Sequence, residues 1–248
     1  MAKGTILDIL QDPYGNDLNM FLPFDVIDST DLILYVQVTY FDCGGMVLGA
    51  AVSHKIADGL SGVVFLNTWA VVAHDERSTV KTPLFDATKY FPPVKLSNFD
   101  PCFELINFNN DIISRRFLFQ ASSINALRDR YAHKIGNRTT RIETLTAFAC
   151  DRIMRTTEIM ANPETMCFIK QILNLRTRMN PPLSGRCIGK YIYKLDVAMF
   201  DINADDACRS VIDEIRETVR KVDLEFLKML QDGEAHMKMM EKRAQAQE

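Results

Sequence analysis

The sequence lacks the features that define several large classes of protein. Its 248 residues include one tryptophan, 11 glycines and 9 prolines, so collagen-like and low-complexity chains are excluded. Neither sign of charge dominates, because 29 basic side chains stand against 32 acidic ones for a net charge of -3. A protein that binds nucleic acid by neutralising phosphates concentrates Lys and Arg, so we expect no nucleic-acid partner. At this length, with 47% hydrophobic residues, the chain can bury a substantial core.

Paired cysteines and long apolar runs are also missing. The cysteines lack the short paired spacings of zinc or redox motifs and stand singly, as Cys43, Cys102, Cys150, Cys167, Cys187 and Cys208. We therefore expect buried thiols in a reducing compartment, and no metal site. Asp8 interrupts the first apolar run, where a signal peptide needs an unbroken one, and no stretch approaches membrane-spanning length. These absences predict a cytoplasmic protein with no membrane partner.

The remaining pattern predicts a fold of mixed α and β structure. Two apolar runs, residues 33–41 and 46–53, flank the turn sequence DCGG and indicate a hairpin of largely buried strands. Residues 59–73 are apolar on most sides, which predicts a helix covered on more than one face. We expect further strands over residues 116–120, 167–175 and 191–200.

Three more helices are expected in the second half of the chain. Ser122 can cap the first, and the capping box of residues 140–143, TRIE, opens the second. The second helix is expected to bury a face that carries Leu145, Ala149 and Ile153. The third is predicted over residues 205–230, followed by a frayed tail after Gly233.

His54 and Asp58 form the one candidate catalytic constellation. A histidine at a strand end, projecting into a loop, is where a scaffold presents a general base to a cleft. Asp58 immediately precedes the helix of residues 59–73, so it can equally be an N-cap, and His54 can equally be a satisfied core histidine. The spacing alone leaves these alternatives open, and two ligands do not make a metal site.

Five ordered segments together resemble the plant BAHD acyltransferases, which move an acyl group from coenzyme A to an alcohol or amine. Residues 47–59, VLGAAVSHKIADG, resemble the HxxxDG segment of that family. The others resemble its LPF element (22–24), its domain-crossing strand and helix (116–122), its TRIEALTAF stretch (140–148) and its NLRxRMxPPL loop (174–183). The form of the loop, with SHKIAD, points to the vinorine synthase-like branch of alkaloid acetyltransferases.

The resemblance implies an incomplete coenzyme A-dependent acyltransferase fold of the chloramphenicol acetyltransferase-like type. The DFGWG signature near the C-terminus of the family is absent and an N-terminal piece is also missing, so the resemblance implies a chain truncated at both ends. Residues 1–75 would form part of an N-terminal lobe, residues 76–114 a proline-interrupted crossover connector, and residues 115–248 the start of a second lobe. Missing sheet partners would expose strand edges, so the chain is expected to self-associate.

The resemblance also implies roles for individual residues. His54 matches the general base that lifts the proton from the acceptor hydroxyl, a task suited to imidazole. Asp58 matches an aspartate that points away from the cleft and pairs with an arginine, here Arg176, and the helix cap remains the alternative. Transfer is direct, so Ser53 and Ser61 are expected to be structural. No cofactor is permanently bound, and acyl-CoA, expected to be acetyl-CoA, is the co-substrate.

A phosphate contact for coenzyme A is expected where Arg138, Thr139 and Thr140 lead into the capping-box helix. Helix N-termini present free amides and a positive dipole end to phosphates. Simple capping by Thr140 is the alternative. The expected acceptor is a hydroxyl of a plant specialised metabolite such as an alkaloid, or an amine. The alternative function is that of an inactive homologue acting as a binding or interaction fragment.

Overall fold

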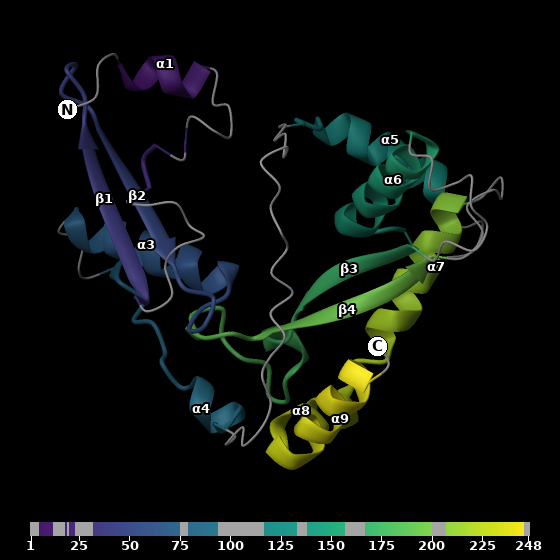
Figure 1. Cartoon of the computed structure of the whole chain (residues 1–248). Helices are drawn as coiled ribbons and strands as arrows, with labels where there is room; N and C mark the ends of the chain where they lie inside the picture. Colours follow the sequence, from purple (N-terminus) through teal and green to yellow (C-terminus); the bar gives the residue numbers. More distant parts are fainter. Residues whose placement is uncertain are drawn as a thin grey trace. The chain divides into compact units, whose positions relative to one another are not determined.

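The computed structural model describes residues 5–11, 18, 20–22, 32–74, 79–93, 117–132, 138–156, 167–199 and 207–245. The chain divides into two compact units, drawn in Figure 1. The first unit contains Met1–Phe117 together with Gly185–Lys190, and the second contains Leu118–Ser184 and Tyr191–Glu248. A short segment from the second half of the sequence therefore folds with the N-terminal unit. The three-part division of the sequence stays a prediction.

The first unit is built on an antiparallel hairpin, preceded by the short helix α1 (Ile6–Gln11). β1 (Leu34–Tyr40) and β2 (Met46–Val52) are joined by a tight turn in which the Gly44 amide donates to the Phe41 carbonyl at 3.0 Å. Gly44 adopts a φ of 80°, which glycine reaches without steric cost. The predicted hairpin is confirmed.

The burial predicted for the hairpin is wrong for one of its faces. Cross-strand neighbours share a face, and the exposed residues of this face are Leu34, Val36, Val38, Tyr40, Met46 and Leu48. A two-stranded sheet can bury a face only against another layer, and among the described residues no third strand pairs with β1 or β2. We refer to these six residues as the hairpin face.

Helix α3 (Gly59–Ala73) has the predicted bounds but not the predicted cover. Ser61 is its one buried residue, and Val63 is 55% exposed. Beyond it lie α4 (Ala87–Tyr90) and a parallel bridge between Leu84 and Cys187. That bridge joins residues 185–190 to the first unit.

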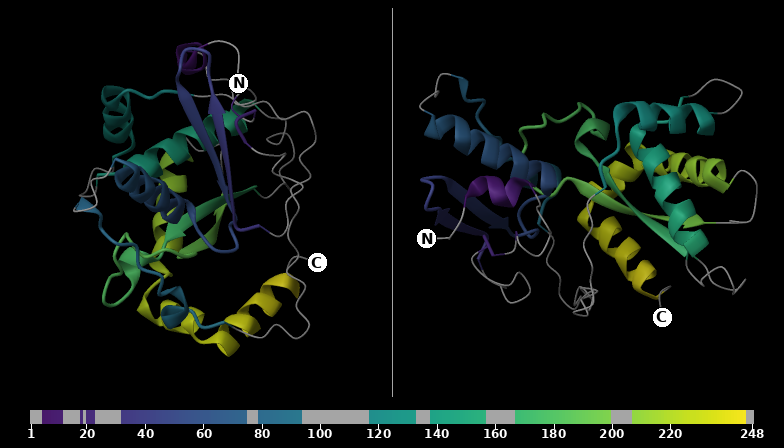
Figure 2. Two further views of the ribbon diagram at one scale, coloured as in Figure 1. Left: turned by 90° about the vertical axis from the view of Figure 1, so that its left-hand side faces the viewer. Right: turned by 90° about the horizontal axis from the view of Figure 1, so that it is seen from above.

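The second unit packs helices on a second antiparallel pair of strands. The two predicted strands form as β3 (Cys167–Asn174) and β4 (Ile192–Met199), and they pair with each other. α5 (Ala121–Tyr131) packs on α6 (Arg141–Thr156), and α7 (Ala207–Arg220) packs on both α6 and β4 (Figures 1 and 2). The core of this unit contains Tyr131, Ala147, Val197, Val211, Ile212 and Ile215.

Two predictions at the start of the second unit are wrong. Residues 117–120 form no strand, and Leu118 is 92% exposed. A strand needs a hydrogen-bonded neighbour, and none pairs with these residues in the described part of the chain. Ser122 does not cap α5, because the helix already begins at Ala121 with the Gln120 carbonyl accepting from the Ile124 amide at 3.1 Å.

α6 begins with the predicted capping box but buries a different face. The Thr140 amide donates to Glu143 Oε2 at 2.7 Å, and the Glu143 amide donates to Thr140 Oγ1 at 3.2 Å. Thr144, Ala147 and Met154 are buried, whereas Ala149 is exposed and Ile153 is 58% exposed. Ala147 lies in the same cluster as two isoleucines of α7. The small side chain of Ala147 therefore packs against α7, whereas the predicted stripe that contains Ile153 does not.

The long helix predicted over residues 205–230 is broken into α7 and α8 (Leu224–Gln231), and a further helix, α9 (Gly233–Gln245), follows. Asp223 caps α8 by accepting from the Phe226 amide at 2.9 Å, and Asp232 accepts from two amides at the start of α9. Arg178 donates to the Val219 and Val222 carbonyls at 3.2 and 3.0 Å, where α7 ends. These caps stabilise separate helices, so the predicted frayed tail is helical through Gln245.

The prediction that the cysteines are buried holds only in part. Cys187 is buried and Cys43 is exposed in the hairpin turn, where no layer covers it. Cys102, Arg116 and two residues of the LPF segment, Pro23 and Phe24, lie outside the described residues. No helix in the described ranges is both long and apolar enough to cross a membrane.

An ion pair joins the first turn of α6 to α7. Arg216 donates to both carboxylate oxygens of Glu143, at 3.0 and 3.1 Å, in bidentate geometry. Partial burial raises the pKa of Glu143, but the hydrogen bonds from Arg216 and Thr140 outweigh it and hold the pKa below its usual range. The ionised carboxylate therefore favours the folded state.

We predict that Glu143→Gln lowers the free energy of unfolding by about 1 kcal/mol at neutral pH, because glutamine keeps the cap but loses a partly screened ion pair. Since folding lowers this pKa, the contribution is complete above the unfolded-state value and is lost as the pH falls through the folded-state value. Urea unfolding across this range measures the difference. The control Glu217→Gln breaks an exposed pair with Lys221 and should change stability by less than about 0.5 kcal/mol. Equal effects at every pH would contradict the assignment.

Candidate active site

The loop between β2 and α3 presents the candidate base. β2 ends at Val52, and the Ile56 amide donates to the Ser53 carbonyl at 3.1 Å, which closes a turn around His54. The His54 side chain is exposed, with its Nδ1 3.0 Å from the Ala57 carbonyl oxygen. A carbonyl can only accept, so Nδ1 carries a proton, and in the neutral ring the lone pair is then on Nε2. The exposure of the residue favours the loop interpretation over that of a core histidine.

Asp58 forms the N-cap of α3, as the alternative interpretation expected. Its backbone is extended, and its Oδ1 accepts from the Ser61 amide at 2.9 Å and from Ser61 Oγ at 2.9 Å. The residue is only 2% exposed. His54 and Asp58 thus have different surroundings, one facing solvent and one buried at a helix end.

Ser61 links this cap to a segment more than a hundred positions away in the sequence. Its Oγ lies 2.8 Å from the Gly189 carbonyl oxygen and accepts from the Gly189 amide at 3.0 Å. The Asp58 amide also donates to the Gly189 carbonyl, at 3.1 Å. Gly189 adopts a φ of 155°, which side chains rarely allow. Sequence reasoning missed this contact, although a hydroxyl three residues after a cap, in the first turn of a largely apolar helix, was the available signal.

Arg176 lies in the second unit, in the single turn Arg176–Arg178 that follows β3. It is 1% exposed, and its guanidinium stacks 4.5 Å from the centroid of the Tyr191 ring. The Asn174 carboxamide oxygen accepts from the Arg176 amide at 3.1 Å and from its Nη1 at 3.4 Å. Arg176 is therefore a buried cation whose guanidinium is fixed by Tyr191 and Asn174.

The three predicted phosphate contacts have three different surroundings. Thr140 is occupied by the capping box. Thr139 is fully buried and shares a hydrogen bond of 2.8 Å with Thr144. Arg138 is exposed, donates to Asn125 at 3.1 Å and lines a pocket of about 350 Å³ in the second unit.

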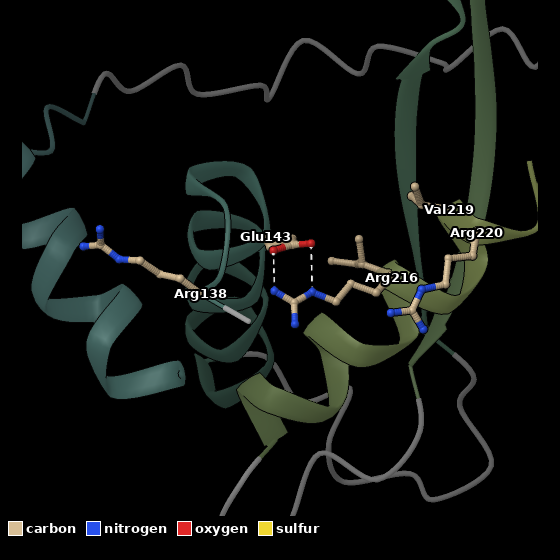
Figure 3. Close-up of a pocket in the computed structure, with 6 residues that line it drawn as sticks. Arg138, Glu143, Arg216, Val219 and Arg220 are labelled. Carbon is tan, nitrogen blue, oxygen red and sulfur yellow. Dashed lines mark hydrogen bonds and ion pairs between the residues drawn. The ribbon is translucent and has the colours of Figure 1, made fainter. Parts of the chain in front are cut away.

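The residues that line this pocket are shown in Figure 3. They are Arg138, Glu143, Ile215, Arg216, Val219 and Arg220. Glu143 and Arg216 face each other across it as the ion pair described above. Within the described residues, no group of three His, Cys, Asp or Glu side chains is placed to hold a metal ion.

Comparison with known proteins assigns the chain to a family. The model of the Transferase family, which comprises the BAHD acyltransferases, matches residues 2–247. The chain belongs to this family. The BAHD resemblance of the sequence motifs is thereby confirmed.

Among its relatives are two plant enzymes of alkaloid metabolism. The chain is 28% identical to stemmadenine O-acetyltransferase of Catharanthus roseus over 90% of its own length and 53% of that protein. It is 32% identical to vinorine synthase of Rauvolfia serpentina over 79% of its own length and 45% of that protein. The chain thus spans about half the length of the BAHD relatives it matches.

The solved structures show the same fold. The crystal structure of vinorine synthase matches with a TM-score of 0.69 at 27% identity, over 88% of this chain and 52% of that one. F. sporotrichioides TRI101, solved with coenzyme A and T-2, matches with a TM-score of 0.64 at 15% identity, over 95% and 57%. The predicted coenzyme A-dependent acyltransferase fold is confirmed for about half of that fold.

We predict that Ser61→Ala lowers the free energy of unfolding of the first unit by about 1 to 3 kcal/mol, because Asp58 and Gly189 each lose a buried partner. Thermal unfolding followed by circular dichroism provides the measurement. Ser122→Ala, which removes an exposed hydroxyl from α5, is the control and should change little. Equal melting temperatures for both variants would show that the link through Ser61 adds nothing.

Proposed function

We propose that the chain carries the base of an acyl-CoA-dependent acyltransferase that moves an acyl group, acetyl in the first instance, to a hydroxyl of an alkaloid-like specialised metabolite. One observation carries the proposal. In a BAHD family member, the HxxxDG histidine is exposed on its loop, and its Nδ1 bond to Ala57 leaves Nε2 free. The cytoplasmic location stays a prediction.

The proposed reaction is a direct transfer. His54 Nε2 takes the proton of the acceptor hydroxyl as its oxygen attacks the thioester carbonyl carbon. The new C–O bond forms, the C–S bond breaks, and the thiolate of coenzyme A recovers the proton from the imidazolium. The products are the ester and free coenzyme A, with no acyl-enzyme. Ser61 is engaged by Asp58 and Gly189, which supports a structural role rather than that of a nucleophile.

Asp58 and Arg176 are proposed to act on position rather than on protons. The family resemblance supports this role, because the HxxxDG aspartate of the family pairs with an arginine, and here both side chains are almost fully buried, at 2% and 1% exposure. We propose that Arg176 is the counterion of Asp58. The pair would hold the loop of His54 in addition to the helix cap.

We propose that acyl-CoA is the co-substrate. The solved structure of TRI101, which has the same fold, contains coenzyme A. Of the three predicted phosphate contacts, we favour Arg138 because it is exposed. The Thr139 and Thr140 side chains are already hydrogen-bonded within the protein.

A thiol-release assay tests the proposed function. A chimera in which this chain replaces the aligned half of vinorine synthase is incubated with acetyl-CoA and a panel of alkaloid alcohols and amines. We expect acceptor-dependent release of free thiol together with the acetylated product. Ester hydrolysis without coenzyme A would assign the chain to another class of reaction.

In the same chimera, His54→Ala should lower kcat by roughly two to four orders of magnitude, because the general base is removed. The exposed site should allow normal folding, which circular dichroism checks. His74→Ala, at the far end of α3, is the control and should keep its rate. A folded His54 variant with near-normal turnover would remove this residue from the mechanism.

Asp58→Asn separates the cap from the ion pair. Asparagine caps as well as aspartate, so loss of the cap alone is excluded as a cause of destabilisation. We predict a loss of roughly 3 to 5 kcal/mol in unfolding free energy, because Arg176 is left buried without its counterion. Asp223→Asn provides a matched control, since Asp223 caps α8 with the same 2.9 Å bond but is exposed. Equal stability of the two variants would assign Asp58 to capping alone.

The alternative function, that of an inactive interaction fragment, rests on the exposed hairpin face. A base in open solvent neither aligns nor shields its substrates, so we predict little or no transfer by the 248-residue chain alone. We also predict that it self-associates, through the hairpin face and the free strand edges. The double variant Val38→Lys/Leu48→Glu, which places opposite charges across the strands, should be monomeric in sedimentation velocity, whereas exposed Ser210→Lys should not. Robust turnover by a monodisperse chain would contradict both predictions.

A further inference from the structure

One peptide group, the one that joins Ala57 to Asp58, contacts both the candidate base and a distant part of the chain. Its carbonyl oxygen, on Ala57, lies 3.0 Å from Nδ1 of His54. Its amide, on Asp58, donates to the Gly189 carbonyl at 3.1 Å. The peptide is trans, so it is planar and its C=O and N–H groups point in opposite directions. The hydrogen bond to Gly189 therefore fixes the direction of the carbonyl that His54 uses.

The direction of the Ala57 carbonyl decides which nitrogen of His54 can act as a base. A neutral imidazole carries its proton on one nitrogen and its lone pair on the other, and the hydrogen bond of the protonated nitrogen selects the form. If this carbonyl turned away, the Nδ1–H tautomer would lose its partner. The other tautomer, whose Nε2 already carries the proton, would then gain population.

Burial makes the contact with Gly189 difficult to replace by water. Ala57 is 6% exposed, Asp58 is 2% exposed, and Gly189 is buried. Hydrogen bonds between buried groups are stronger than in water, and successive bonds through one peptide polarise one another. The bonds that run from Gly189 through this peptide to His54 form such a chain.

The backbone at Gly189 is itself held from two sides. The Gly189 amide donates to Ser61 Oγ at 3.0 Å, and the adjacent Ile188 amide donates to the Leu84 carbonyl at 2.7 Å. Gly189 also has a φ of 155°, a conformation that residues with a side chain rarely adopt. Its carbonyl therefore has a fixed direction toward Asp58.

We propose that Gly189 is a positioning residue for His54, which acts through the Ala57–Asp58 peptide to hold the imidazole in the Nδ1–H tautomer. Residues 185–190 thereby set the protonated form of a base that lies in the loop between β2 and α3. Gly189 touches no reacting atom. Its effect on the rate rests on the proposed function, whereas its effect on the tautomer does not.

Solid-state nitrogen-15 NMR of the whole chain, labelled at histidine, measures the tautomer directly and does not require a monomer. The spectra are recorded in alkaline buffer, where imidazole is neutral. Among the four histidines, the signals of His54 are those that His54→Ala removes. We expect a single Nδ1–H form in the unchanged chain. In Gly189→Ala, where the side chain forces the backbone to rotate, a mixture with the Nε2–H form should replace it.

Two other glycines provide matched controls. Gly185→Ala changes the same segment at a site where an added Cβ meets no atom within 4 Å. Gly44→Ala introduces backbone strain at a φ of 80°, in the hairpin turn. Both variants should keep the single Nδ1–H form. A single Nδ1–H form in a folded Gly189→Ala chain, or an equal mixture in Gly44→Ala, would overturn the proposal.

If Gly189→Ala does not fold, Ser61→Ala takes its place, because it removes only the bond to the Gly189 amide from this chain of contacts. The second tautomer should then appear in Ser61→Ala but not in Ser61→Thr, which keeps the hydroxyl. Its absence from a folded Ser61→Ala chain would contradict the positioning role.

The kinetic test uses the vinorine synthase chimera. Gly189→Ala should lower kcat by about ten- to a hundredfold and leave the KM for acetyl-CoA unchanged, because a misplaced base impairs proton transfer rather than binding. Gly44→Ala should keep both constants. An active chimera whose kcat does not respond to Gly189→Ala would remove Gly189 from the mechanism. An inactive chimera would count against the proposed function, and the NMR result would still decide the positioning role.

Discussion

The buried carboxylate of Asp58 is the constraint on which the candidate site depends. A carboxylate at 2% exposure is stable only if its oxygens are satisfied, and the start of α3 supplies an amide and a hydroxyl for one of them. Because Ser61 Oγ also accepts from the Gly189 amide, and the Asp58 amide donates to the Gly189 carbonyl, the same contacts fix residues 185–190 against the loop. The turn that exposes His54 is therefore held by groups that take no part in proton transfer.

Local signals in the sequence predicted the elements that depend on a few neighbouring residues. The DCGG turn, the start of α3 after Asp58 and the capping box at Thr140 all form as expected, because each is decided by hydrogen bonds within four or five positions. The candidate residues His54 and Asp58 were found by the same local reading. The same segment decides their surroundings, because His54 lies in the exposed loop after β2 and Asp58 lies at the start of α3.

Features that depend on distant partners could not be predicted. α6 carries two apolar stripes, and the cluster with α7 decides that Ala147 rather than Ile153 is buried. The sequence of residues 205–230 has an unbroken apolar periodicity and predicted one helix. In the structure, Arg178 from the turn after β3 donates to the carbonyls where α7 ends. Ser61 and Gly189 are separated by 128 positions, so no spacing rule relates them. The α6 face and the Ser61 contact are decided by groups from another part of the chain, and the helix break combines such a group with the local caps Asp223 and Asp232.

One carboxylate, Glu143, links the start of α6 to α7 in the second unit. It closes the helix start that the sequence offered as a phosphate site, and it recruits Arg216 in doing so. Closing the helix start engages its capping-box amides, while fixing Arg216 aligns α7 so that Arg220, one turn further on, lines the pocket. The cations that remain lie on side chains rather than on the backbone. The ion pair of Glu143 and Arg216 therefore joins the start of α6 to α7 and sets which side chains surround this pocket.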